Sequence, residues 1–90
     1  MGVIDDATYR ALDEELERAA CLHPTVPKIE RCFVVLGEEV GEACKEVLSM
    51  TRTDWEAVQK IHAKNARAEL LQVAATALRM ADKLLGGPCE

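Results

Sequence analysis

Apolar residues recur along this chain at intervals of three and four positions, the spacing that places side chains on one side of an α-helix. This spacing predicts a first helix over 6–22, with Asp5 or Asp6 as its N-cap. Pro24 and Pro27 are expected to separate it from the next helix, because proline donates no backbone hydrogen bond and restricts the residue before it. Strand-like alternation and internal repeats are absent from the sequence, which therefore predicts an all-α fold.

A second helix is expected from about Pro27 to about Met50, since proline suits the first turn of a helix. Its apolar residues are spaced alternately by four and three positions, as in the seam of a helical bundle or coiled coil. This predicted seam consists of Ile29, Phe33, Leu36, Val40, Ala43 and Val47. We expect the predicted seam to pack against another helix.

A third helix is expected over 54–85. Thr53 and Glu56 have the spacing of a capping box, and the glycines and proline at 86–88 predict its end. Its apolar stripe comprises Leu70, Ala74, Ala77 and Ala81. An unbroken helix here would be roughly 50 Å long, whereas a compact domain of this size is about 30 Å across. The helix is therefore expected either to break, near Asn65, or to extend into a partner chain.

Ninety residues are enough for one small domain, taken as 1–90, and too few for two. Hydrophobic residues make up 49% of the chain and aromatic residues only 3%, so the core must consist of small aliphatic side chains, which favours packed helices. A monomer this small buries too little surface to be more than marginally stable. We therefore expect a bundle of about three helices that dimerisation completes into a four-helix-bundle-like core.

The formal net charge of -5 disfavours nucleic acid and anionic membranes as partners, because both require a cationic surface. No apolar run reaches the roughly 18 residues that span a bilayer, and the N-terminal segment lacks the pattern of a signal peptide. These features predict a cytoplasmic protein.

Four cysteines without C-x-x-C spacing are expected to be reduced thiols, with a disulfide or metal role as the alternative. They are Cys21, Cys32, Cys44 and Cys89.

Acidic residues gather beside the predicted seam of the second helix. At about 100° per residue, Glu39, Glu42 and Glu46 lie on one shoulder of that helix. Glu69 and Gln72 lie on the corresponding shoulder of the third helix. If the two helices pack antiparallel, these shoulders face each other. Like charges at this spacing destabilise a helix, and a bound cation would offset the repulsion.

A divalent cation is one explanation of these carboxylates, and a solvated acidic helix face is the other; the spacing alone leaves both open. Ligands that are all oxygen suit Mg²⁺ or Mn²⁺, whereas the absence of histidine and cysteine from the group argues against zinc. The chain has no Glu-x-x-His pair of the di-iron bundles. It also lacks a P-loop, a dinucleotide-binding glycine motif and a G-x-S-x-G elbow.

The stretch Leu-Gly-Glu-Glu-Val-Gly-Glu at 36–42, followed by a second acidic helix that carries Glu69, resembles the MazG-like all-α nucleoside triphosphate pyrophosphatases. The motifs of that family are E-E-x-x-E and E-x-x-D, and the resemblance covers 23–83. It implies a helical dimer or dimer of dimers that uses Mg²⁺ to cleave a nucleotide between its α and β phosphates, releasing pyrophosphate. By position, Glu39, Glu42 and Glu69 match the metal ligands, and Glu38 matches the first glutamate of the motif.

The resemblance implies catalytic roles for these four glutamates and leaves the substrate contacts to other side chains. The candidates for those contacts are Arg31, Asn65, Gln72 and Lys83. Gln72 stands where the motif has aspartate, and an amide offers a metal its carbonyl oxygen but no charge. This departure supports a second hypothesis, a non-catalytic MazG-like module that binds a nucleotide or a protein partner. Hydrolysis of phosphoribosyl-ATP is a further alternative within the family.

Overall fold

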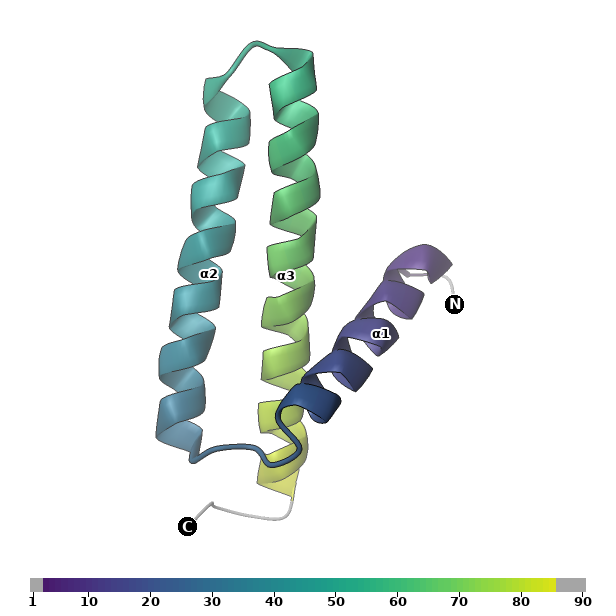
Figure 1. Cartoon of the computed structure of the whole chain (residues 1–90), viewed down its shortest axis with the longest axis vertical. Coiled ribbons are helices and arrows are strands. Elements are labelled where there is room, and N and C mark those ends of the chain that lie inside the picture. The colour runs from purple at the N-terminus through teal and green to yellow at the C-terminus, as the bar shows by residue number, and fades with distance from the viewer. Residues whose placement is uncertain (1–2, 86–90) are drawn as a thin grey trace.

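The computed structural model describes residues 3–85, which form three α-helices joined by two short loops (Figure 1). Helix α1 spans Asp6–Leu22, α2 spans Ile29–Arg52 and α3 spans Glu56–Leu85. Residues 3–85 contain no strand, so the prediction of an all-α fold with three helices is confirmed. None of these three helices is long and apolar enough to cross a membrane.

Helices α2 and α3 form a long antiparallel hairpin (Figure 1). Helix α3 is continuous through Asn65, and its 30 residues give a length of about 45 Å. This length accounts for the elongated shape of the molecule, which measures 48 × 30 × 23 Å. Of the two outcomes expected for the third helix, a break near Asn65 is therefore wrong. The end predicted at 86–88 lies outside the described residues.

The ends of α1 follow the sequence signals closely. The Asp5 side chain caps the helix by accepting a hydrogen bond from the Ala7 backbone N–H at 2.8 Å. At the other end, His23 is the C-cap, and its N–H donates to the Ala19 carbonyl oxygen at 2.8 Å. The first helix and its acidic N-cap are thus as predicted, because both depend on residues close in sequence.

The starts of α2 and α3 differ in detail from the expectation. Helix α2 begins and ends two residues later than predicted, so Pro27 precedes the helix instead of occupying its first turn. Thr53 and Glu56 do not form the predicted capping box. The Thr53 hydroxyl instead accepts from the Trp55 N–H at 3.3 Å, and Glu56 pairs with Lys60 at 3.3 Å. Helix α3 begins only at Glu56, which places Thr53 ahead of the N-cap position.

The surface between α2 and α3 has the expected alternation of three and four, but it is rotated from the predicted seam. We call the residues along this contact, all buried or half-buried, the hairpin seam. On α2 they are Ile29, Cys32, Leu36, Glu39, Ala43, Glu46 and Met50. On α3 they are Gln59, His62, Ala66, Glu69, Val73, Thr76, Met80 and Lys83. Three members of the predicted seam, Phe33, Val40 and Val47, are instead 62%, 49% and 38% exposed.

The three cysteines in the described part of the chain are free thiols. Cys32 is buried in the hairpin seam, where its thiol donates to the Pro27 carbonyl oxygen at 3.4 Å. Cys21 and Cys44 are exposed. Cys89 lies outside the described residues.

Helix α1 packs on α3 and diverges from the hairpin toward its own N-terminus (Figure 1). None of its residues is buried. A single side chain, Arg79 of α3, attaches its C-terminal end by donating to the carbonyl oxygens of Ala19, at 3.3 Å, and His23. A cation at this position also interacts favourably with the negative end of the helix dipole. Arg79 is therefore the main polar link between α1 and the hairpin.

Replacing Arg79 with alanine is expected to lower the free energy of unfolding by about 1–2 kcal/mol, because two carbonyl oxygens lose a charged donor. Amide hydrogen exchange should rise in α1 and stay unchanged in the middle of the hairpin. Arg67→Ala, at an exposed position of the same helix, is the control and should change stability by less than about 0.5 kcal/mol. Unchanged exchange in α1 would contradict the role given to Arg79.

Candidate functional site

The hairpin has one polar and one apolar side, and each forms a cavity with a different half of α1. The polar cavity has a volume of about 410 Å³ and lies beside the C-terminal half of α1. Its polar lining residues are Glu15, Arg18, His23, Arg31, Glu39, Gln72, Thr76 and Arg79. The apolar groove, of about 520 Å³, lies beside the N-terminal half of α1. Its hairpin walls include Val47, Met50, Leu70, Leu71 and Ala74.

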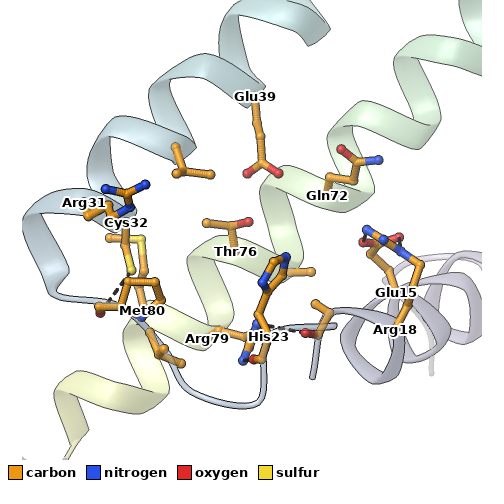
Figure 2. Close-up of a pocket in the computed structure, with 15 residues that line it drawn as sticks. Glu15, Arg18, His23, Arg31, Cys32, Glu39, Gln72, Thr76, Arg79 and Met80 are labelled. Carbon is orange, nitrogen blue, oxygen red and sulfur yellow. Dashed lines mark hydrogen bonds and ion pairs between the residues drawn. The ribbon is translucent and has the colours of Figure 1, made fainter. Parts of the chain in front are cut away.

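Glu39 enters the polar cavity from α2, with its carboxylate directed toward α3 above Thr76 (Figure 2). The residue is half-buried, and its Oε1 is shielded from solvent and has no hydrogen-bond partner among residues 3–85. A shielded carboxylate oxygen without a partner has lost its hydration without compensation. Binding of a cation or a hydrogen-bond donor at this oxygen would therefore be favourable, because it would replace the hydration that the Glu39 carboxylate has lost.

A second carboxylate lies at the same level of the hairpin seam. His62 Nδ1 and Glu46 Oε2 are 2.6 Å apart, and this contact fixes which turn of α2 faces which turn of α3. Glu39 precedes Glu46 by seven residues, and Glu69 follows His62 by seven. Because the helices are antiparallel and seven residues are about two turns, Glu39 and Glu69 lie at one level. The structure thus places two of the glutamates that spacing singled out at one level of the hairpin seam, where Glu39 lines the polar cavity and Glu69 does not.

The other two candidate glutamates lie outside the seam. Glu42 is exposed, because it stands a further 60° or so around α2 from Glu39, and Glu38 is exposed on another side of the helix. Across residues 3–85, no three His, Cys, Asp or Glu side chains are grouped so that they could hold a metal ion. The chain by itself therefore offers a pair of seam carboxylates and not a preformed site of three acidic ligands.

The four candidate substrate contacts fall into two groups. Arg31 and Gln72 line the polar cavity on opposite helices of the hairpin (Figure 2). Lys83 and Asn65 are not among the residues that line it. The Lys83 ammonium donates to the carbonyl oxygens of Val26, at 2.8 Å, and Pro27, at 3.0 Å, so it holds the loop between α1 and α2 against the end of α3.

Two arginines that line the polar cavity, Arg18 and Arg79, were not among the residues predicted from the sequence. Arg18 of α1 is bonded to Glu15, and this hydrogen bond and charge raise the pKa of Arg18 above its usual value. The negative charge of Glu39 acts in the same direction. Arg79 follows Gln72 by seven residues, so helical spacing alone could have placed it on the same side of α3. The position of Arg18 had no such signal, because it depends on how α1 docks.

No family model, curated protein or solved structure matches this chain. The resemblance to the MazG-like pyrophosphatases therefore rests on the motif at 36–42 and on the glutamate that follows it on the next helix of the hairpin.

Without divalent metal, Glu39→Gln is expected to raise the free energy of unfolding by about 1 kcal/mol, because it removes a half-buried charge at the level of Glu69. Urea denaturation in the presence of a chelator measures this change. Glu38→Gln, one residue earlier and exposed, is the matched control and should change stability by less than about 0.5 kcal/mol. A loss of stability in Glu39→Gln would mean that the carboxylate has a stabilising partner in the metal-free protein.

Proposed function

We propose that this protein is a Mg²⁺-dependent nucleotide pyrophosphohydrolase, which cleaves a nucleoside triphosphate or modified nucleotide between the α and β phosphates. The products are a nucleoside monophosphate and pyrophosphate. The observation that carries the proposal is the partnerless Oε1 of Glu39, which lies on the polar cavity at the level of Glu69. The motif that contains Glu39 supports the same chemistry.

The donor set fits the proposed metal. Carboxylate oxygens are hard ligands that suit Mg²⁺ or Mn²⁺, and Mg²⁺ is commonly held by one or two protein carboxylates together with substrate phosphates. Glu39 and Glu69 would provide these carboxylates, and Glu42, one turn beyond Glu39, is the third proposed ligand. When bound, the ion supplies charge neutralisation on the phosphates and activation of the attacking water.

The remaining side chains of the cavity would bind and orient the substrate. Arg31 offers a guanidinium to the phosphate oxygens, and the Gln72 amide offers either a donor or a carbonyl oxygen. The apolar residues Val35 and Met80 line the same cavity and limit access of bulk water. Glu38 matches the motif but is exposed on a side of α2 that lies away from the hairpin seam, so we assign it no step in the reaction.

The exposed apolar side of the hairpin supports a homodimer as the functional form. Phe33, Val40 and Val47 of α2 are exposed on the side of the seam that lies away from the polar cavity, and Leu70 of α3 is 52% exposed on that side too. Apolar residues grouped in this way on a small soluble protein indicate an interface. We infer that two hairpins pack through this apolar face to form a four-helix core, either as a dimer or within a dimer of dimers.

A specific observation favours a second candidate function, a module that binds a nucleotide or a protein partner without hydrolysis. Gln72 lines the polar cavity where the motif has aspartate, so the cavity carries one negative charge fewer for a cation. The described residues also lack a group of three acidic or histidine ligands. Weaker retention of Mg²⁺ would leave the same cavity able to bind a ligand.

The hydrolase proposal predicts pyrophosphate release from at least one compound in a panel of canonical and modified nucleoside triphosphates and phosphoribosyl-ATP, with Mg²⁺ or Mn²⁺. Glu39→Gln and Glu69→Gln should each lower kcat/KM by at least about 100-fold, because each removes a proposed metal ligand. Glu17→Gln, an exposed position of α1 outside the cavity, should retain activity.

Absence of pyrophosphate release above the level of the Glu39→Gln variant, for every compound and both metals, would contradict the hydrolase. Calorimetric titration separates the second candidate, since saturable binding of an unchanged nucleotide would support the non-catalytic module.

A dimer predicts a mass twice that of the 9.9 kDa chain in sedimentation equilibrium, and a dimer of dimers predicts four times that mass. Val40→Glu should shift the protein toward monomer, because it would place a charge inside the apolar interface. Val34→Glu is the matched control: Val34 is 61% exposed and points away from α3, so this variant should remain dimeric. A monomeric wild-type protein, or equal dissociation of both variants, would contradict the proposed interface.

A further inference from the structure

One side of α2 has no neighbouring helix within the described chain. Helix α1 packs on α3, and α2 packs only on α3, so the side of α2 that points away from the hairpin is open (Figure 1). Exposed, uncharged residues follow this side at spacings of three and four, as in helices that pack against each other. We call these residues the outer face of α2: Val34, Gly37, Gly41, Cys44 and Leu48.

The two glycines of the outer face have no steric reason within the single chain. Glycine inside a helix is less stable than alanine, because its backbone loses more conformational freedom on folding. A Cβ atom at Gly37 or Gly41 would meet nothing within 4 Å. Glycines do, however, allow the axis of a second helix to approach closely. Val34 and Leu48, which are 61% and 43% exposed, provide apolar contact area on either side of the glycines.

The charges that bound the outer face make it complementary to itself. Glu30 and Arg52 are exposed, and neither side chain has a hydrogen-bond or ion-pair partner among residues 3–85. Both lie 11 residues from Gly41, one before it and one after it. Two antiparallel α2 helices that cross at Gly41 therefore bring Glu30 of each copy beside Arg52 of the other. Val34 and Leu48, each seven residues from Gly41, meet in the same way. A parallel pair would place like charges together.

The chain also exposes more surface than one interface would cover. Its accessible surface is 6789 Å², whereas a compact monomer of 9.9 kDa exposes about 5200 Å². The excess, about 1600 Å², is twice the area of about 800 Å² that a standard interface buries on each partner. The apolar face of the proposed dimer accounts for one such interface. The outer face lies farther around α2 and stays exposed in that dimer.

We propose that the outer face of α2 is a second interface between copies of this chain, in which two α2 helices cross antiparallel at Gly41. This inference rests on the proposed dimer for its stoichiometry, since the two interfaces together build a dimer of dimers. A single pair of helices buries less area than a four-helix core, so the second contact is the weaker one. Dimers should therefore associate to tetramers as the protein concentration rises. Val34→Glu should keep the dimer and lose this second step.

Sedimentation equilibrium over a range of protein concentrations, with a chelator present, tests the contact. The wild-type mass should rise from two toward four times 9.9 kDa. Gly41→Gln should weaken the second step by at least about tenfold, because a bulky side chain separates the helices where they cross. Its fold should persist, since the position has open space and glutamine is the better helix former. Glu38→Gln places the same side chain on another side of α2 and should associate like wild type.

Charge reversal tests the antiparallel orientation. Glu30→Arg and Arg52→Glu should each weaken the second step by about threefold or more, since each places like charges opposite one another. The double variant should return to within about twofold of wild type, because the opposite charges meet again. Only the antiparallel arrangement gives this recovery. Circular dichroism of each variant controls for folding.

Association that Gly41→Gln leaves unchanged, an equal loss in Glu38→Gln, or a double charge reversal that restores nothing would overturn the proposal. A single step from monomer to dimer that Gly41→Gln weakens and Val40→Glu does not would support the outer face and contradict the proposed four-helix dimer alone. Pyrophosphate release is measured separately, so a protein that forms this contact and hydrolyses no nucleotide would contradict only the proposed hydrolase.

Discussion

The contact between Glu46 and His62 determines how the hairpin is assembled, and the rest of the structure depends on that assembly. A polar contact within a helical seam fixes register and rotation more tightly than interchangeable apolar residues do. With this contact made, Glu39 and Glu46, and not the neighbouring Val40 and Val47, face α3. The small residues Ala43 and Ala66 lie buried in the same seam and allow the two backbones to approach closely.

This rotation divides the apolar residues of the chain between two surfaces. The fully buried apolar residues of the described chain are few, and all except Met80 have small side chains: Cys32, Ala43, Ala66, Ala75 and Met80. Such a core removes little apolar area from water, while Phe33 and Leu70 remain outside it. The proposed dimer would bury that second surface. In this arrangement the polar side of the seam is left for ligands, and the apolar side provides the additional burial that a short chain requires.

The sequence predicts the helices well because their limits depend on neighbouring residues: Asp5 caps α1, and the prolines separate α1 from α2. It does not predict the rotation of α2. Phe33, Val40 and Val47 repeat every seven residues, and so do Cys32, Glu39 and Glu46, each series one position earlier. If the contact between α2 and α3 were the only place where apolar side chains could be buried, hydrophobicity would favour placing the first series there. In the single chain the first series is exposed instead, and a partner chain could bury it.

The same distinction between local and tertiary information applies to the proposed site. Spacing identified Glu39 and Glu69 because both lie on a shoulder that one helix presents to its antiparallel neighbour. The cavity itself exists only where α1 crosses α3, and Arg79 holds α1 there through its carbonyl oxygens. A ligand that contacts Arg31 and, through a cation, the seam carboxylates would offset the repulsion between Glu39 and Glu69. Its binding free energy would then add to the stability of the fold, since such a ligand binds the folded chain alone.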